Sequence, residues 1–232
     1  KQDNFQANIG YQFTEKLAVS AASNYGKYKN DLAAGAFTDD KDYTSSNTSF
    51  INSIALVYKL KTGSLHFTNT FINAQRQLKN DTTSAAGNGS YYRGNFKGRS
   101  YVAELFGNVA LSNKFSLTGG VQRMAQNTDQ NNAGYIRDYD YRYSSVLGKD
   151  SAHTTNYSVY ASLLLLNING FNAEAGVRYN NHSIYGSNAT YSFNPSYNID
   201  ENTKVFVNIS SAFKVPSLYQ LYGEYGNKNL QP

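Results

Sequence analysis

The sequence predicts an all-β protein that supplies about ten strands of an antiparallel, up-and-down transmembrane β-barrel. Three observations support this prediction. Segments of about ten residues alternate apolar and polar side chains, their connections alternate between very short and long, and 21 Tyr and 13 Phe give a β-rich aromatic content. The mean hydropathy is −0.56, and apolar runs such as Leu163–Leu166 are far shorter than the roughly 20 residues of a membrane helix.

The expected strands are joined in pairs by tight turns. Residues that suit short hairpins fall at 14–16, 61–63, 112–113, 169–170 and 200–202. Period-two alternation bounded by these turns places the strands, in chain order, near residues 4–13, 17–28, 50–60, 64–76, 99–111, 114–126, 154–168, 170–182, 188–199 and 203–213.

The first two hairpins are predicted from this alternation alone. In the third hairpin, individual residues also indicate which face of each strand is apolar. In strand 99–111, Tyr101, Leu105 and Val109 oppose the polar Glu104, although Val102 and Phe106 blur the polar face. In the next strand, Gly119 and Gly120 lie within the strand pattern and not before a helix. They therefore predict a bulge or a bend of the barrel, not a phosphate loop.

The last two hairpins have the clearest patterns. Ala173, Ala175 and Val177 alternate with Glu174 and Arg178, and these charges cannot face lipid. Strand 188–199 alternates nearly perfectly except at Pro195. Because proline removes a ladder donor, it predicts an edge or a bulge there.

Long connections are expected near residues 29–49, 77–98 and 127–153, with a shorter one near 183–187. All of them fall at one end of the predicted strands, and they contain most of the Asp residues. Transmembrane barrels have short periplasmic turns and long extracellular loops, whereas a sandwich has no reason to segregate them. This asymmetry favours the bacterial outer membrane.

Composition excludes several other classes. The chain has no Cys, which removes disulfides and most soft-metal sites. The net charge is +5, but the basic residues form no stripe or basic helix, so nucleic acid is not expected as a partner. No signal peptide precedes Lys1, and we therefore expect the chain to be a portion of an exported protein.

The segment at 210–232 carries a resemblance to a known family. It reads SSAFKVPSLYQLYGEYGNKNLQP, in which Phe213, a basic residue, Val215 and Pro216 precede a Gln-Leu-Tyr triplet and a Gly-Asn-x-Asn-Leu-x-Pro ending. This resembles the segment midway through the barrel of TonB-dependent outer-membrane receptors, and within them the cobalamin receptors most. The chain departs from the family pattern at Lys228, where a second proline is usual.

The resemblance implies a partial receptor barrel over residues 1–232, from a barrel of about 22 strands closed by an amino-terminal plug. It implies no enzyme activity. The implied function is import of a scarce bulky nutrient, such as cobalamin or a siderophore, with the missing plug contacting TonB. Aromatic loop residues are then the expected ligand contacts: Tyr139, Tyr141, Tyr143 and Tyr222.

An acidic loop is the candidate metal site. Hard cations such as calcium take carboxylate and carbonyl oxygens from flexible loops, and cobalamin receptors of the family bind calcium in extracellular loops. The residues concerned are Asp31, Asp39, Asp40 and Asp42, whose spacing matches no EF-hand. The alternative is a solvated acidic surface.

Other interpretations stay open at this stage. His66, His153 and His182 are isolated, but His153 with Asp150 permits an omptin-like protease, which is a self-contained small barrel, as is a passive pore. A soluble or surface-associated β-sheet protein is another alternative. The basic run Arg93, Lys97 and Arg99 suits lipopolysaccharide phosphates, a funnel rim or a solvated loop end.

Overall fold

The computed structural model describes residues 1–81, 89–223 and 226–232, which form one antiparallel sheet of 12 strands. Glu224 and Tyr225 of the family-like segment lie outside this range. The strands are β1 (Gln2–Gln12), β2 (Leu17–Gly35), β3 (Thr38–Lys59), β4 (Gly63–Asn80), β5 (Tyr91–Ala110), β6 (Phe115–Ile136), β7 (Tyr141–Leu147), β8 (His153–Ile168), β9 (Phe171–His182), β10 (Gly186–Asn198), β11 (Lys204–Phe206) and β12 (Ile209–Ser210).

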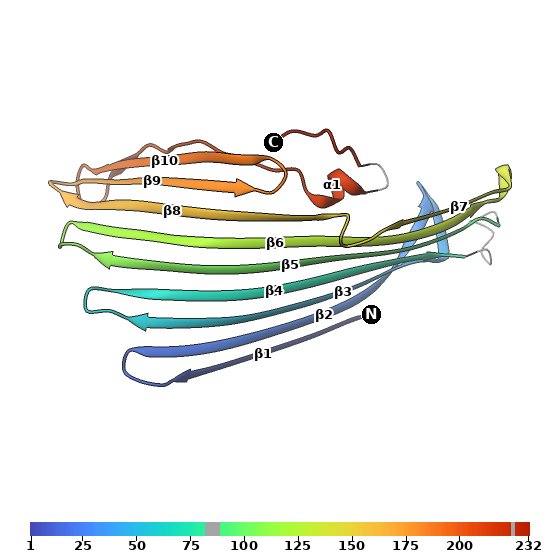
Figure 1. Ribbon diagram of the computed structural model, residues 1–232, viewed down its shortest axis with the longest axis horizontal. Helices are drawn as coiled ribbons and strands as arrows, with labels where there is room; N and C mark the ends of the chain where they lie inside the picture. The colour runs from blue at the N-terminus through green and yellow to red at the C-terminus, as the bar shows by residue number, and fades with distance from the viewer. Residues whose placement is uncertain (82–88, 224–225) are drawn as a thin grey trace.

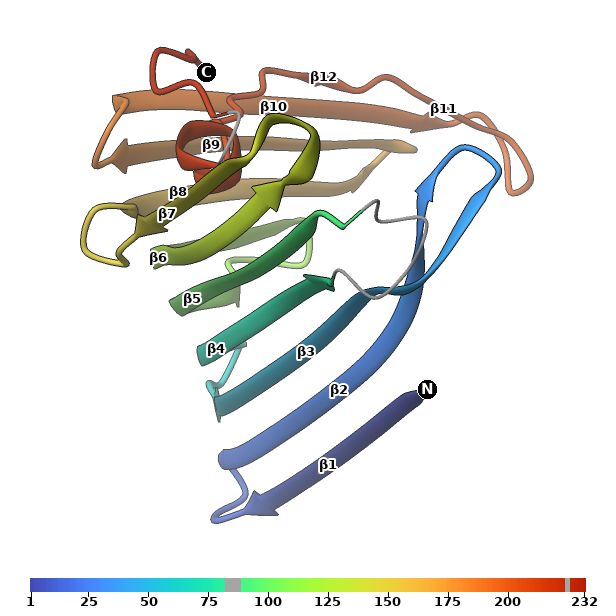
Figure 2. The same ribbon diagram turned by 90° about the vertical axis from the view of Figure 1, so that its right-hand side faces the viewer.

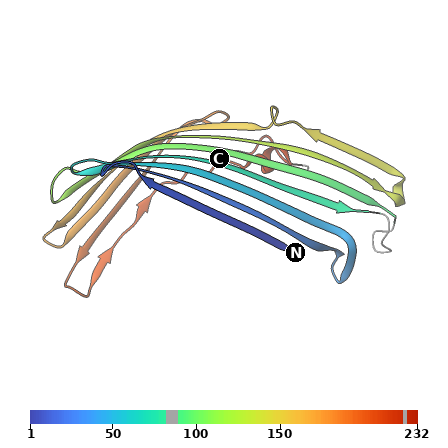
Figure 3. The same ribbon diagram turned by 90° about the horizontal axis from the view of Figure 1, so that it is seen from below.

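Consecutive strands are neighbours, which confirms the predicted up-and-down topology. The order is β1-β2-β3-β4-β5-β6-β8-β9-β10-β11, with β7 paired to β6 and β12 paired to β10. The tight turns gather at one end of the sheet and the long hairpins at the other (Figure 1). Viewed along the strands the sheet curls into an open trough (Figure 2), and from below it forms an arched wall (Figure 3).

The convex face of the wall is apolar and exposed. Large side chains on it, such as Val159 and Val177, are 57% and 64% exposed. Among the described residues, only Ala152 and Leu221 are buried hydrophobic residues. A soluble sheet would bury its apolar face against a second layer, so this wall has the surface distribution of a barrel in lipid.

Aromatic rings mark the upper boundary of this apolar band, where "upper" means toward the long hairpins. Along most strands the last outward apolar residue at this end is aromatic, and the next outward residue is polar or charged. Such a girdle suits amphipathic rings at the headgroup boundary. By the strand registers it comprises Phe5, Tyr25, Phe50, Phe71, Tyr101, Tyr157 and Tyr179.

The predicted long loops are wrong in extent, because paired strand continues far into them. β2 and β3 reach Gly35 and Thr38, β5 begins at Tyr91, and β6 runs to Ile136 and pairs with β7. Beyond the membrane both faces of a strand meet water, so the apolar alternation ends while the hydrogen-bonded ladder continues. Period-two hydrophobicity therefore detects only the lipid-spanning part of each strand.

Two local expectations also change. Gly119 and Gly120 pair in unbroken register with both neighbouring strands, so the predicted bulge is absent at this described position. The predicted strand 203–213 is split into β11 and β12. The gap lies opposite Pro195, which has no N–H to donate, although its carbonyl still accepts from the Val207 amide at 3.1 Å.

Helical structure is confined to two short pieces among the described residues, η1 (Arg137–Tyr139) and α1 (Leu218–Tyr222). Neither has the length and apolar character needed to cross a membrane. Helix α1 begins with a capping box: the Ser217 hydroxyl accepts from the Gln220 amide at 3.2 Å, and Gln220 Oε1 accepts from the Ser217 amide at 2.9 Å. It contacts β6 within the trough.

Candidate functional site

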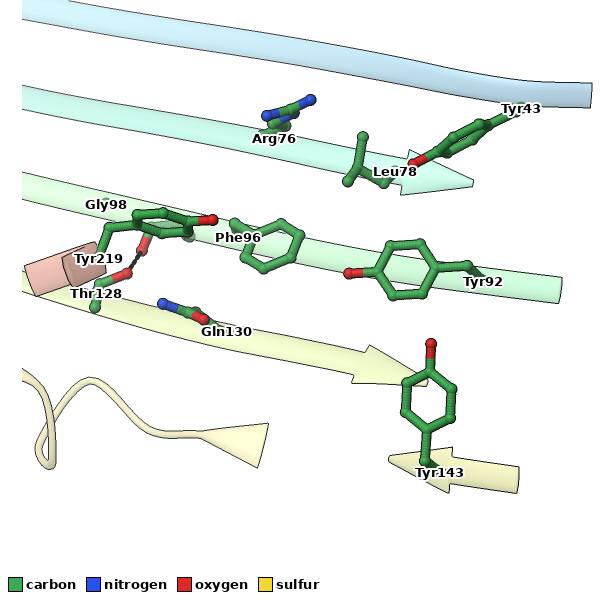
Figure 4. Close-up of a pocket in the computed structure, with 11 residues that line it drawn as sticks. Tyr43, Arg76, Leu78, Tyr92, Phe96, Gly98, Thr128, Gln130, Tyr143 and Tyr219 are labelled. Atoms are coloured by element: carbon green, nitrogen blue, oxygen red, sulfur yellow. Dashed lines mark hydrogen bonds between the residues drawn. The ribbon is translucent and has the colours of Figure 1, made fainter. Parts of the chain in front are cut away.

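An aromatic cavity of about 520 Å³ lies on the concave face, toward the long hairpins. We call it the rim cavity. It is assembled from separate strands and from α1, whose side chains converge in Figure 4. Its lining residues are Tyr43, Arg76, Leu78, Tyr92, Phe96, Lys97, Gly98, Thr128, Gln130, Tyr143 and Tyr219.

Strand alternation explains why these residues face one another. Arg76 and Leu78 are two apart on β4, and Tyr92, Phe96 and Gly98 share the inward parity of β5. Gly98 leaves the floor of the rim cavity open, since a Cβ added there would meet no atom within 4 Å. The Thr128 hydroxyl next to it donates to the Lys97 carbonyl at 3.1 Å, which fixes β6 beside this floor.

Two other glycines let rings lie flat against the wall. Tyr143 pairs with Gly134 across the β6–β7 ladder, and a Cβ at Gly134 would overlap the Tyr143 ring. A Cβ at Gly94 would come within 2.8 Å of the Tyr92 hydroxyl and 2.7 Å of the Phe96 ring. Only glycine provides this space without displacing the aromatic lining.

The rim cavity offers ring faces, phenol hydroxyls and one inward guanidinium, that of Arg76. No acidic residue belongs to its described lining. Stacking and cation–π contacts suit a ligand with flat or apolar surfaces, and the cation and hydroxyls suit oxygen acceptors. Among the described lining residues, no nucleophile is paired with a base, so the arrangement suits the binding of a ligand and not a catalytic step.

Closer to the tight turns, the concave face carries a connected polar network. The Tyr160 hydroxyl reaches from β8 across β6 and donates to Glu104 Oε1 at 2.8 Å, while Gln122 donates to the same carboxylate at 3.3 Å. Gly120 lies beneath this bridge, and a Cβ there would come within 2.7 Å of the Tyr160 hydroxyl. Gly120 is thus explained by the passage of the Tyr160 side chain over it.

Arg178 joins this network from β9. Its guanidinium donates to Gln122 Oε1 at 2.7 Å, Ser158 Oγ at 2.9 Å and Asn180 Oδ1 at 3.0 Å, and lies 5.4 Å from the Tyr160 ring centre. The predicted inward position of Arg178 is confirmed. Its bonds connect β6, β8 and β9 into a rigid polar wall.

The four residues predicted to contact the ligand lie at different positions relative to the rim cavity. Tyr143 lines the cavity. The ring of Tyr141 stacks on the ring of Tyr143, with ring centres 6.0 Å apart, and Tyr141 remains exposed. Tyr139 lies in η1 and is 81% exposed. Tyr222 lies on α1 outside the lining, with Lys228 Nζ 5.1 Å from its ring centre.

The hairpin near Tyr139 is closed by a tyrosine and an aspartate. Tyr135 donates a hydrogen bond of 3.0 Å to Asp140 Oδ1, and this bond raises the pKa of Tyr135 above its ordinary value. Asp140 is in the left-handed region with φ of 45°. The interaction fixes the turn that leads into β7 and its tyrosines.

Sequence reasoning missed most of the rim cavity. The missed residues with the strongest binding chemistry are Tyr43, Arg76, Tyr92, Phe96 and Tyr219. Most of them fall in or beside segments that were expected to be loops, where no inward or outward parity was assigned. The available signal was the alternation of Tyr92 and Phe96 with polar residues between them.

The acidic residues proposed for calcium are spread along the β2–β3 hairpin. Asp31 pairs with Thr44, Asp39 pairs with Ala33, and the buried Asp40 accepts hydrogen bonds of 3.3 Å from the Asp42 amide and from Asn80. In the described parts of the chain, no three acidic or histidine side chains are grouped so that they could hold a metal ion. Calcium binding stays a prediction.

Each histidine has a local structural role. His153 Nδ1 lies 3.0 Å from the backbone carbonyl of Asp150, and not against its carboxylate. His66 stacks on Phe106 at 4.6 Å, and His182 Nδ1 accepts from the Ile184 amide at 3.2 Å. The Asp–His pair required by the omptin-like alternative is therefore not supported.

The basic run of β5 lies on the convex face. Arg93, Lys97 and Arg99 share the outward parity of Tyr101 and Leu105, which argues against a funnel rim, although Lys97 is also among the residues that line the rim cavity. Arg99 is paired across the ladder, since its Nη1 lies 2.7 Å from Asp129 Oδ2 and 2.9 Å from Asn127 Oδ1.

Comparisons with known proteins agree with this geometry. The family model described as TonB dependent receptor-like, beta-barrel, matches residues 1–232. The vitamin B12 transporter BtuB of Photobacterium profundum is 25% identical over 235 residues, covering 100% of this chain and 34% of that protein. BtuB of Vibrio cholerae is 42% identical over 60 residues, covering 25% of this chain and 10% of that protein.

Solved structures share the fold. The copper transporter OprC matches with a TM-score of 0.74 at 12% identity, over 96% of this chain and 38% of that one. The ferric yersiniabactin uptake receptor FyuA of Yersinia pestis matches with a TM-score of 0.68 at 12% identity, over 89% and 37%. The chain thus spans about a third of the length of the relatives that it matches over its whole extent.

Proposed function

The chain belongs to the TonB-dependent receptor β-barrel family, and we propose that it forms part of the wall of an importer for a scarce, bulky nutrient. Members of this family are transporters of the bacterial outer membrane and not enzymes. The apolar convex face, the aromatic girdle and the one-sided hairpins are what such a location requires.

The rim cavity is the observation that supports nutrient binding. It opens on the concave face at the end with the long hairpins, which is the extracellular end in this class of barrel. Its rings, hydroxyls and Arg76 suit a ligand that combines a flat or ring-shaped body with oxygen acceptors. Cobalamin and ferric siderophores both have this character, and relatives named for each are among the matches.

Energy coupling through TonB is part of the same proposal. The polar network of Glu104, Tyr160 and Arg178 lines the concave face between the rim cavity and the tight turns. A nutrient released from the rim cavity toward the periplasm would therefore pass along a polar inner wall. In this family a separate plug domain fills that passage and receives force from TonB. In the proposed division of roles, the wall binds and positions the nutrient while the plug gates.

The test uses the intact receptor, produced in cells that lack their own receptors for the ligand. Uptake of labelled cobalamin and of a labelled ferric siderophore is measured with and without TonB. We expect saturable uptake of one of them that disappears without TonB. Uptake of equal rate in cells without TonB would instead establish a passive pore.

Calcium binding is a subsidiary proposal that rests on the acidic β2–β3 hairpin. Carboxylates at Asp31, Asp39 and Asp42 lie on one extracellular hairpin, where a calcium ion would join its two strands. Calorimetric titration of the intact receptor with calcium tests this. No heat beyond that of a variant with Asp31→Asn and Asp39→Asn would refute it.

A further inference from the structure

We propose that the open edge of β7 binds an extended, acidic peptide by strand addition on the extracellular side of the wall. The proposal rests on the orientation of the wall in the proposed function, and it goes beyond that function because it adds a ligand that neither nutrient class supplies. Three features of β7 support it: a row of unpaired main-chain groups, a step in the rim of the sheet beside them, and a cation without an acidic partner among the described residues.

The rim of the sheet steps down beside β7. β6 continues to Ile136, whereas β9 ends at His182, which lies at the level of Met124 on β6. Met124 and Ile136 are twelve residues apart, which is about 40 Å along the strand. Figure 1 shows β7 beyond the ends of β8, β9 and β10. The lower end of β7 lies opposite Gln130, seven residues of β6 above the level of the girdle residue Tyr157, so this edge is in water.

Three residues of β7 direct their main-chain groups to the open side. The Thr128 amide donates to the Ala152 carbonyl at 2.9 Å, so the even-numbered residues of β6 direct their hydrogen-bonding groups toward β7 and β8. Their partners on β7 are Tyr141, Tyr143, Ser145 and Leu147. The alternate residues Arg142, Ser144 and Val146 therefore present N–H and C=O groups away from β6. Within the described parts of the chain, β7 pairs with β6 alone.

The edge of β7 lacks the devices that usually protect an exposed strand. Natural edge strands are very short, bulged, or interrupted by proline or lysine. β7 has seven residues in unbroken register with β6, and it contains neither proline nor lysine. Its Tyr and Val residues also favour extended backbone. Only another extended main chain matches a row of alternating donors and acceptors, which identifies a peptide as the class of ligand.

The concave side of β7 favours a single extended chain over the strand of a folded partner. Tyr143 lines the rim cavity, and the Tyr141 ring stacks on it. A chain added to β7 would place alternate side chains beside these two rings, on the inner side of the trough. A free peptide has room there, whereas a folded protein would have to enter the trough.

Arg142 gives the edge a preference for an acidic residue. Its side chain shares a face of the sheet with Tyr135, its partner across the ladder, and the guanidinium carbon lies 5.2 Å from the centre of that ring. Among the described residues, no carboxylate lies within ion-pair distance of Arg142. The residue opposite Arg142 in an added antiparallel strand lies on the same face, so a carboxylate there would complete an ion pair.

The experiment measures peptide binding to the intact receptor in mild detergent by fluorescence anisotropy. The probe is a labelled heptapeptide of Thr and Val with blocked ends and Glu in the sixth position, which lies opposite Arg142 when the first residue lies opposite Leu147. One derivative is N-methylated at the second, fourth and sixth residues, and the other at the third, fifth and seventh. Only the first set faces β7, so we expect the first derivative to bind at least tenfold more weakly and the second to bind as the probe does.

Variants of β7 test the same edge from the side of the receptor. Ser144→Pro removes a donor from the open edge and leaves the bonds to β6 in place, so it should weaken binding of the probe at least tenfold. Ser144→Ala is the matched control and should bind as the wild type does. Arg142→Glu should weaken binding of the probe, and a probe with Lys in the sixth position should restore it. Heat-modifiable migration on gels shows that each variant is folded.

Amide exchange in the intact receptor gives an independent readout. Without peptide, the amides of Arg142, Ser144 and Val146 should exchange faster than that of Ser145, and the probe should slow them. Equal binding of the two N-methylated derivatives, or wild-type affinity in Ser144→Pro, would overturn the proposal. Slow exchange at Ser144 without peptide would also overturn it, because another strand of the receptor would then already occupy the edge.

Nutrient uptake is measured in parallel and should be unchanged in Ser144→Pro, since Ser144 does not line the rim cavity. A receptor that binds the probe but imports neither nutrient would refute the proposed function and leave the peptide site standing. Uptake without any binding of the probe would refute the peptide site alone.

Discussion

At the scale of single residues, the space left by glycine decides where large side chains lie on the concave face. Gly134 and Gly94 admit the rings of Tyr143, Tyr92 and Phe96, and Gly120 admits the Tyr160 hydroxyl on its way to Glu104. A Cβ at any of the three would force a shift of its neighbours. The aromatic and polar features of the inner wall therefore depend on positions that carry no side chain.

Gly98 differs from these glycines, and this makes it the sharpest probe of the rim cavity. Because no atom lies within 4 Å of the added Cβ position, Gly98→Leu should fill the floor without strain, with a stability change within about 0.5 kcal/mol. We expect at least a tenfold rise in the Kd for the imported nutrient, measured by calorimetry on the intact receptor.

The matched control is Gly148→Leu, since Gly148 follows β7 and its added Cβ is equally free of neighbours. It should bind the nutrient as the wild type does. Wild-type affinity in Gly98→Leu, with the side chain confirmed in the cavity, would show that the nutrient binds elsewhere.

At the scale of elements, the hairpin between β9 and β10 depends on a neutral histidine. His182 is 5% exposed and lies above Tyr179, outside the apolar band, and its Nδ1 accepts from the amides of Ile184 and Tyr185 at 3.2 and 3.4 Å. Protonation of Nδ1 would remove this acceptor. Burial lowers the pKa of His182 below its ordinary value of 6.5.

The sign of the pH dependence follows from this shift. With the folded-state pKa below 6.5, the stabilisation is complete above about pH 6.5 and is lost as the pH falls through the lower, folded-state pKa. We expect amide exchange at Ile184 and Tyr185, corrected for its intrinsic pH dependence, to accelerate on acidification in the intact receptor. His182→Gln should flatten this pH profile, and an unchanged profile in that variant would assign the effect to another group.

The elements show how far sequence alone could reach. The alternation of Ala173, Ala175 and Val177 with charged residues fixed the orientation of β9, because lipid imposes period two on the membrane-spanning part of the strand. The same reasoning failed for the outer parts of β5 and β6, where water meets both faces. Tyr92 and Phe96 were therefore placed in a loop, and most of the rim cavity was missed.

Longer-range contacts had no sequence signal at all. Glu104 and Tyr160 are 56 residues apart and meet only because β5, β6 and β8 are neighbours with Gly120 between them. The motif at Phe213–Pro216 indicated the family correctly, yet it could not show that α1 would bring Tyr219 to the rim cavity.

At the scale of the whole molecule, the sheet by itself neither covers its apolar convex face nor pairs the hydrogen-bonding groups of its edge strands. Its convex face exposes large apolar side chains, and among the described residues β1 pairs on one side only, with β2. A barrel closes such edges, whereas unpaired N–H and C=O groups in hydrocarbon cost several kcal/mol each. The remaining barrel strands of the family are the natural partners for both edges.

This leads to a prediction about residues 1–232 produced alone. The eleven residues of β1 would expose an unpaired edge in lipid, so we expect this segment to aggregate on refolding into detergent, without the heat-modifiable migration of a closed barrel. The intact receptor refolded in parallel should show that migration. A monodisperse, heat-modifiable species from residues 1–232 would mean that the segment closes on itself or assembles with copies of itself, and the sheet would then be a complete barrel wall instead of one portion of a larger wall.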